Sequence, residues 1–214
     1  MTENIVIRGE NLELLPERCV FLPSSRTLLA ADLHWGKAEV FQRSGIAVSS
    51  KVLADDLQRL SRAIERTKPS ELIILGDLIH APVGITPEVV AAVSAWRDKH
   101  AGLKISLIRG NHDRRFILPE IWRIEVHDSP IERKPFLLAH DPPTEPGDLH
   151  VLSGHLHPVV RLTGGGDSLR LPCFAVGKTG SVLPAFSLFT GGLELKKRDW
   201  RQLFVVTDNS VIEV

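Results

Sequence analysis

Apolar and polar positions follow different patterns in the two halves of this chain. In the first half, short apolar runs that predict buried strands alternate with longer segments of helical periodicity. Strands alternating with helices in this way are typical of an α/β fold. The strands expected in this half lie at residues 5–8, 19–22, 28–31, 71–75 and 103–108.

The helical segments of the first half are marked by apolar periodicity and by end signals. Residues 51–66 have the clearest pattern, with one apolar face and one charged face. A second helix is expected at residues 88–100 after Pro87, which suits a first helical position, and a short helix should follow Gly36. In the helix at 51–66 the expected inner residues are Val52, Leu53, Leu57, Leu60 and Ile64, and the outer ones Asp55, Asp56, Arg59, Arg62 and Arg66.

The second half is predicted to consist mainly of strands joined by turns. A glycine tract at residues 164–166 predicts a hairpin turn. Strands and helices followed by strands alone favour an α/β fold, a four-layer α/β/β/α sandwich of two mixed sheets, and the length suits a single domain over residues 1–214. The expected strands of this half lie at residues 123–127, 136–139, 151–152, 159–162, 168–171, 173–176 and 203–206.

Composition bears on the cellular compartment of the protein but does not identify a ligand. Acidic and basic residues number 26 each, so net charge offers no argument for nucleic acid binding. Cys19 and Cys173 form no metal-binding spacing and are expected to be buried free thiols. No apolar run approaches the length of a membrane span, and the N-terminus lacks the pattern of a signal peptide, so we expect a cytoplasmic protein without membrane contact.

Five short polar signatures directly follow five of the apolar runs. Because loops at strand ends gather on one rim of an α/β sheet, their side chains are expected to meet. Carboxylate, amide and imidazole groups together can hold a pair of divalent metal ions, which activate water for attack at phosphorus. The signatures are Asp32-Leu33-His34, Gly76-Asp77, Gly110-Asn111-His112-Asp113, His140 and Gly154-His155-Leu156-His157.

The order of these signatures resembles that of the calcineurin-like metallophosphoesterases, over residues 32–157. A closer likeness, over almost the whole chain, is to the ligase-associated DNA-damage-response endonucleases of bacterial repair clusters. It is carried by residues 31–39, 76–80, 110–114, 183–186 and 189–192. The resemblance implies a hydrolase with two divalent metal ions, most commonly Mn²⁺, with Fe or Zn also compatible with these ligands.

The same resemblance implies a role for each signature residue. His112 would meet the substrate and protonate the leaving oxygen, with Asp113 orienting His112. The first metal would be held by Asp32, His34 and His157, the second by Asn111, His140 and His155, and Asp77 would bridge the two.

For other residues near the signatures, the sequence predicts roles that are less specific. His80 stands where many relatives have Asp, and the closer endonucleases share this His, so we expect an outer-sphere or substrate role. Arg114, Arg115 and Lys37 are candidates for holding phosphate oxygens. Trp35 could stack on a base or cover the core beneath the first metal loop.

These expectations favour a metal-dependent phosphodiesterase, specifically a DNA endonuclease that acts on single-stranded or flexible DNA in repair. The ligase and helicase of the same repair cluster are possible partners. An alternative is an enzyme that cleaves a small phosphoester, such as a cyclic nucleotide, with the same metals. A third reading, a non-catalytic scaffold with this fold, conflicts with the complete set of signature residues.

Overall fold

The computed structural model of this protein describes residues 1–145 and 147–214. Within these residues the chain forms three α-helices and two β-sheets. The helices are α1 (Lys37–Arg43), α2 (Val52–Thr67) and α3 (Pro87–Lys99), with short 3-10 helices at Pro82–Gly84, Glu120–Trp122 and Lys197–Asp199. The strands are β1 (Glu3–Ile7), β2 (Glu10–Leu14), β3 (Val20–Leu22), β4 (Thr27–Ala30), β5 (Glu71–Leu75), β6 (Lys104–Ile108), β7 (Glu125–His127), β8 (Ile131–Arg133), β9 (Phe136–Leu138), β10 (His150–Ser153), β11 (Pro158–Gly164), β12 (Asp167–Val176), β13 (Gly180–Val182), β14 (Leu193–Glu194), β15 (Gln202–Val206) and β16 (Val211–Glu213).

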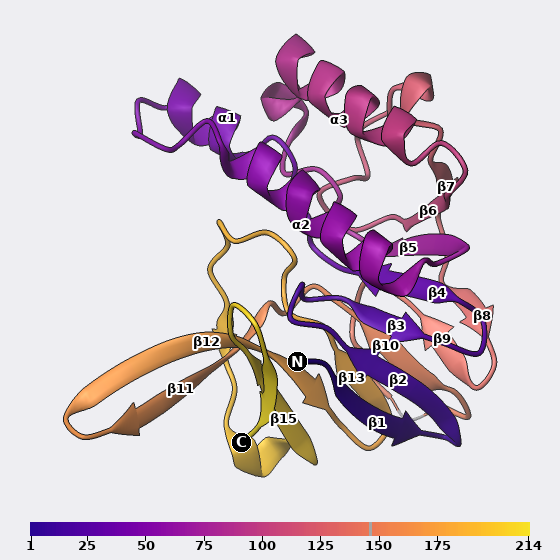
Figure 1. Ribbon diagram of the computed structural model, residues 1–214, viewed down its shortest axis with the longest axis vertical. Coiled ribbons are helices and arrows are strands. Elements are labelled where there is room, and N and C mark those ends of the chain that lie inside the picture. The colour runs from indigo at the N-terminus through magenta and orange to yellow at the C-terminus, as the bar shows by residue number, and fades with distance from the viewer. Residues whose placement is uncertain (146) are drawn as a thin grey trace.

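The two sheets differ in their number of strands and in the order of those strands. In the described part of the chain, the first sheet has seven strands in the order β1 to β7, and β4 to β7 are parallel. The second has nine strands, with the path β14-β11-β12-β13-β10-β9-β8 and β15 and β16 attached at β12. All three helices lie on the side of the first sheet, and the β11–β12 hairpin projects from the second (Figure 1).

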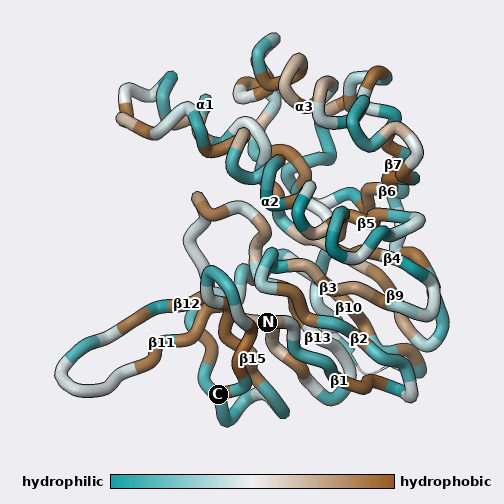
Figure 2. Tube along the Cα trace, in the orientation of Figure 1, coloured by the Kyte–Doolittle hydropathy of each residue, from teal (hydrophilic) through white to brown (hydrophobic). Residues whose placement is uncertain are grey.

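The core is layered because strand side chains alternate between two faces. On β4, Leu28 and Ala30 pack toward the helices, whereas Leu29 belongs to the cluster between the two sheets. On β12, Phe174 faces that same cluster, and Cys173 faces a smaller cluster on the outer side of the second sheet. The strands β5 and β6 are hydrophobic along most of their length (Figure 2). Parallel strands buried on both faces have this composition.

The sequence-based elements are largely confirmed. The helices at 51–66 and 88–100 and the short helix after Gly36 correspond to α2, α3 and α1. The α/β class and the two mixed sheets are also confirmed. The segments at 168–171 and 173–176 form one continuous strand, β12. The strands that were not expected are β2, β8, β13, β14 and β16. A single domain over residues 1–214 stays a prediction.

The described α-helices pack on only one outer face of the two-sheet sandwich, that of the first sheet. Within residues 1–145 and 147–214, no α-helix follows α3. The outer face of the second sheet is covered by partly buried apolar side chains, among them Leu195 and Trp200. In this respect the arrangement differs from a sandwich with helices on both outer sides.

Two residues of α2 contradict the sequence-based prediction. Asp56 and Arg59 were expected to face solvent, yet they are only 2% and 6% exposed. Their side chains form an ion pair of 2.8 Å, and Arg59 also donates a hydrogen bond to the carbonyl of Phe186. A helical pattern treats charged residues as outward-facing, but here a distant loop supplies the partners that burial requires.

The two cysteines are buried and free, as expected. Burial raises the pKa of the Cys173 thiol to about 12. None of the helices in the described ranges is long and apolar enough to cross a membrane.

Candidate metal centre

The five polar signatures meet where the two sheets lie together. Three of them follow β4, β5 and β6, which are adjacent parallel strands. The other two follow β9 and β10, which are adjacent and parallel in the second sheet. Because the chain leaves adjacent parallel strands at the same edge, their loops form one cluster.

Left-handed backbone conformations aim several of these side chains. The φ angles of Asp32, His34, Asp77, His155 and His157 are 57°, 48°, 50°, 70° and 49°. This region is sparsely populated by residues other than glycine, and such residues concentrate at functional sites. The left-handed turns let short loops direct successive polar side chains into one small volume.

The first candidate ligand group consists of Asp32, His34 and His157, with one ligand atom of each within 4.8 Å of the others. The Nε2 atoms of His34 and His157 are 3.2 Å apart, and Nε2 of His157 is 3.4 Å from Oδ1 of Asp32. Burial above all, and then His157, lowers the pKa of His34 to about 2. His34 is therefore neutral, which is the form that binds metal.

The second group consists of Asp77, His140 and His155. Nε2 of His140 is 3.6 Å from Oδ1 of Asp77 and 3.1 Å from Nδ1 of His155. Oδ1 of Asn111 lies 3.0 Å from the same His140 nitrogen. Nδ1 of His140 contacts the carbonyl of Leu75 at 3.0 Å, which orients the ring and leaves Nε2 facing the group.

The two groups fit the binding of cations. Oδ1 of Asp32 is buried and has no hydrogen-bond partner within the described residues. A buried carboxylate oxygen without a donor is costly unless a cation compensates it. The mixed carboxylate, amide and imidazole donors suit manganese, iron or zinc. His155 and His157, two positions apart, belong to different groups, in agreement with the assignment made from the sequence.

Glycines in the signatures allow the backbone to approach these carboxylates. A Cβ atom at Gly154 would stand 2.6 Å from Oδ2 of Asp32. A Cβ atom at Gly110 would collide with Oδ1 of Asp77. Only the absence of a side chain permits this packing, which accounts for the glycine in both signatures.

His112 lies at the mouth of the site, but Asp113 does not orient it, so that expectation is wrong. The carboxylate of Asp113 accepts hydrogen bonds from the backbone N–H groups of Gly110, Ile79 and Leu78, at 2.9, 3.1 and 3.3 Å. It thereby ties the third signature to the loop of the second.

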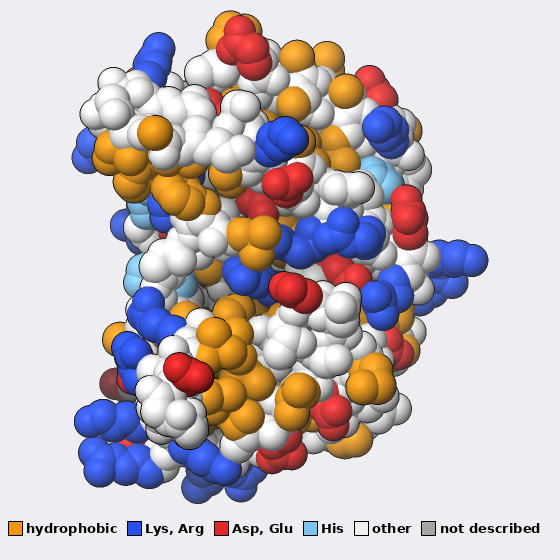
Figure 3. All heavy atoms as spheres, turned by 60° about the vertical axis from the view of Figure 1, so that its left-hand side comes forward, with side chains coloured by type: hydrophobic (Ala, Val, Ile, Leu, Met, Phe, Trp, Pro, Cys, Tyr) orange, Lys and Arg blue, Asp and Glu red, His pale blue; other side chains and the backbone are white. Residues whose placement is uncertain are grey.

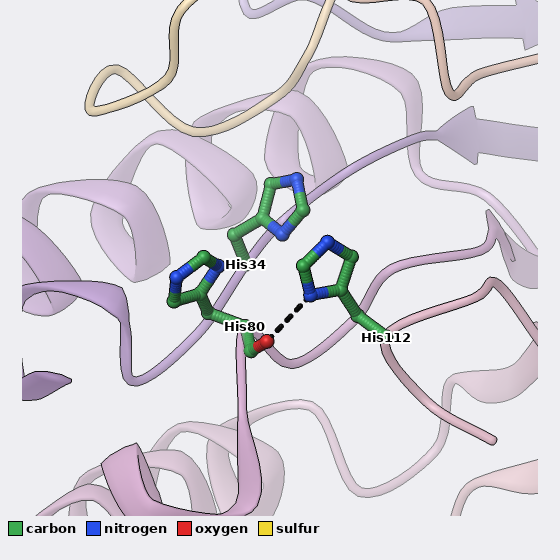
Figure 4. Close-up of side chains that lie close together, drawn as sticks. All are labelled: His34, His80 and His112. Atoms are coloured by element: carbon green, nitrogen blue, oxygen red, sulfur yellow. Dashed lines mark hydrogen bonds between the residues drawn. The ribbon is translucent and has the colours of Figure 1, made fainter.

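The His112 ring is held instead by the backbone of His80. Its Nδ1 donates to the His80 carbonyl oxygen at 2.6 Å, shown as a dashed line in Figure 4. The rings of His80 and His112 are stacked, with centroids 5.2 Å apart, and His34 lies beside both. One ligand atom from each of these three histidines falls within a single 4.8 Å cluster. His80 thus stands next to the first ligand group, where an outer-sphere or substrate role was expected.

Comparison with known proteins agrees with this geometry. The family described as Calcineurin-like phosphoesterase matches residues 25–163, which include every signature. The chain belongs to this family. Among curated proteins no sequence matches it.

One of the solved structures compared is strongly similar to this phosphoesterase. Pseudomonas putida nuclease MPE is 39% identical, with a TM-score of 0.88 and 100% of both chains covered. The E. coli phosphoesterase Yfce is 19% identical, with 88% of this chain and 97% of its own covered and a TM-score of 0.45. Family and neighbour together identify a metal-dependent phosphoester hydrolase.

The basic residues expected to hold phosphate lie in different places around the phosphoesterase centre. Arg114 lines a groove of about 960 Å³ that begins at His140 and is bordered by both acidic and basic side chains. Arg115 is exposed. Lys37 is half-buried near His80, whose pKa is lowered to about 4 by burial and, to a smaller degree, by Lys37.

The aromatic residues around the phosphoesterase site differ in their roles. Trp35 is only 2% exposed and packs against Trp96 and Trp122, so it covers the core and is not a base-stacking residue. Instead, Phe41 and Phe189 are the aromatic side chains at the edge of the site. Phe189 lies in the segment 189–192 that carries the closer resemblance, but no local pattern assigned either ring to the site, because Phe189 reaches it only through the tertiary fold.

Proposed function

We propose that this phosphoesterase is a dinuclear metal-dependent phosphodiesterase that cleaves DNA, single-stranded or flexible, as an endonuclease in repair. One observation carries the choice of substrate: a solved nuclease is similar to the chain over its whole length, at 39% identity. The chemistry is supported by the two ligand groups, Asp32, His34 and His157 in one and Asp77, His140 and His155 in the other.

In this proposal each ligand group holds one divalent ion. Asp77 would be the ligand shared by both ions, as the family resemblance implies. Its Oδ1 lies 3.6 Å from Nε2 of His140, and its Oδ2 lies 3.9 Å from Nε2 of His112, whose ring is 5.1 Å from that of His34. When bound, the ions polarise phosphoryl oxygens and activate water. The first ion is held by Asp32, His34 and His157, and the second by Asn111, His140 and His155.

His112 is the proposed general acid. Because a carbonyl oxygen can only accept, the bond to His80 requires a proton on Nδ1 of His112. Nε2 is then the nitrogen that exchanges a proton with the substrate, and it lies 3.9 Å from Oδ2 of Asp77. The protonated ring donates from Nε2 to the leaving oxygen.

Phosphate oxygens of the substrate are contacted in this proposal by Lys37, Arg114 and Arg115. His80 positions His112 through its carbonyl and borders the substrate with its ring. The ligand chemistry is compatible with manganese, iron or zinc, and the resemblance to repair endonucleases favours Mn²⁺. Association with a ligase or helicase is a further expectation from that resemblance, and a cytoplasmic location is expected from the sequence.

The test compares four substrates with purified protein and added Mn²⁺. These are a single-stranded oligonucleotide, the matched duplex, a cyclic nucleotide and a bis-aryl phosphodiester. We expect cleavage of the single strand at internal positions and of the aryl ester, with less cleavage of the duplex. Hydrolysis of the cyclic nucleotide without cleavage of either DNA would support the small-phosphoester alternative instead.

A further inference from the structure

Two phenylalanine rings stand beside the candidate metal centre and belong to none of the hydrophobic clusters of the described residues. Phe41 comes from α1 and Phe189 from the segment between β13 and β14. Both are partly exposed, and their ring centroids are 5.2 Å apart at 79°. Side chains that only filled the core would be expected inside one of those clusters.

The rings form one end of an aromatic row that leads to the proposed general acid. Phe41 lies 6.4 Å from the ring of His80, tilted by 36°. His80 in turn stacks on His112 at 5.2 Å and 24°. In Figure 3, hydrophobic side chains gather directly above the histidines, where the surface is hollowed. A flat group bound against Phe41 and Phe189 would therefore be a near neighbour of a phosphate at the metals.

A cation accompanies the two rings. Lys37 is four residues before Phe41 on α1, so the two side chains share a face of the helix. The Lys37 ammonium lies 6.0 Å from the centroid of the Phe189 ring, within cation–π range. A nucleotide combines a flat base with an anionic phosphate, and this pairing of rings and ammonium matches that combination.

The segment that carries Phe189 is firmly attached. Arg18 donates hydrogen bonds to the carbonyls of Ala185 and Ser187, at 3.1 and 3.0 Å. The backbone N–H of Ser187 donates to the carbonyl of Asp32 at 3.3 Å. The backbone N–H of Phe189 donates to the hydroxyl of Ser187, also at 3.3 Å. The backbone just before Phe189 is thus bonded to a candidate metal ligand through Ser187, which places the Phe189 segment beside the centre.

We propose that Phe41 and Phe189 form a stacking subsite for an unpaired nucleobase next to the scissile phosphate, with Lys37 contacting a neighbouring phosphate. This inference rests on the proposed nuclease function and adds how the enzyme selects its substrate. A base in a duplex has its faces covered by its neighbours, so the subsite favours single-stranded substrates.

The test measures kcat/KM for Phe41→Ala, Phe189→Ala and the double variant with Mn²⁺. On a single-stranded oligonucleotide we expect a loss of about tenfold to a hundredfold, the range for removing the ring under a stacked base. On methyl nitrophenyl phosphate, an aryl ester with no nucleobase and with its single ring in the leaving group, the rate should change less than about threefold. Ile46→Ala is the matched control, because Ile46 is an exposed apolar residue, 50% accessible, in the segment after α1.

A second arm removes the base instead of the ring. An oligonucleotide with abasic residues around the cleaved position should be a poorer substrate for the wild type. The Phe variants should cleave it no worse than the wild type does, because the two changes remove the same contact. Equal loss by the variants on normal and abasic strands would overturn the subsite, as would equal loss on the aryl ester.

Failure of this inference differs from failure of the proposed function. If the wild type cleaves the aryl ester but no oligonucleotide, both the nuclease assignment and the subsite are wrong. If the wild type cleaves oligonucleotides and the double variant cleaves them equally well, only the subsite is wrong. Thermal unfolding of each variant shows whether a lost rate reflects lost structure.

Discussion

The carboxylate of Asp32 is held by the backbone of His155, whose N–H donates a hydrogen bond to Oδ2 at 2.9 Å. The bond joins residues 123 positions apart. Oδ1 of the same carboxylate has no such partner within the described residues and lies 3.4 Å from Nε2 of His157. One oxygen thus fixes the position of a distant loop, and the other is available to a cation.

These two roles of Asp32 can be separated by substitution. In Asp32→Asn the amide oxygen can still accept from His155, but the negative charge is lost. We expect the variant to stay folded, to lose about one ion per chain by elemental analysis and to lose more than ~100-fold in activity. Asp32→Ala, the comparison variant, should lower the melting temperature as well. Two retained ions in Asp32→Ala would rule out Asp32 as a ligand.

Asp77 should be the residue whose loss most affects both ions. A bridging carboxylate binds the two cations and offsets part of their repulsion. Asp77→Ala should therefore remain folded, fail to retain two ions and lose activity. Asp128→Ala, which removes a largely exposed carboxylate at the rim of the groove, should keep both. Elemental analysis showing two ions in Asp77→Ala would refute the bridging role.

The proposed acid role of His112 depends on the leaving group. His112→Ala should reduce DNA cleavage by about 10²–10⁴-fold, because the sugar leaving group needs a proton. A nitrophenyl leaving group departs unprotonated, so hydrolysis of the aryl ester should be much less affected. Metal content should match the wild type. Equal losses on the two substrates with metals retained would indicate phosphate binding instead.

Asp113 should matter for stability through the backbone groups that it satisfies. Asp113→Ala leaves the N–H groups of Gly110, Ile79 and Leu78 without their acceptor. Each buried donor left unsatisfied costs about 1–3 kcal/mol, so the free energy of unfolding should fall by several kcal/mol. Asp113→Asn, which keeps one acceptor oxygen, should lose less. Denaturant unfolding of both variants measures the difference, and equal stability to the wild type would contradict this role.

The buried ion pair of Asp56 and Arg59 on α2 leads to a prediction about stability that does not involve the metal ligands. Arg59→Met leaves the Asp56 carboxylate, which is 2% exposed, without its ion pair. Removing one partner of a buried pair costs about 3–5 kcal/mol. The double variant Asp56→Leu/Arg59→Met should be more stable than Arg59→Met alone, because it removes the unpaired charge. A single variant as stable as the wild type would show that water reaches the site.

Much of the fold was predictable because its signals are local. The periodicity of residues 51–66 and Pro87 before the next helix predicted α2 and α3, and apolar runs predicted the strands that carry the signatures. Asp56 and Arg59 were misassigned for a physical reason. Periodicity describes the polarity of positions along one helix. It contains no information about a distant hydrogen-bond acceptor such as the carbonyl of Phe186, which stabilises the buried charge of Arg59.

The metal centre, like the fold, was predictable from the sequence in some respects and not in others. The sequence by itself determined which residues could be ligands, because metal chemistry selects residue types and strand ends gather at one edge of a sheet. Only the tertiary structure decided that Asp113 binds backbone and not His112, and that Phe41 and Phe189, not Trp35, border the site. Those outcomes depend on side-chain direction and on contacts between separate segments of the chain, and no local pattern of residues encodes them.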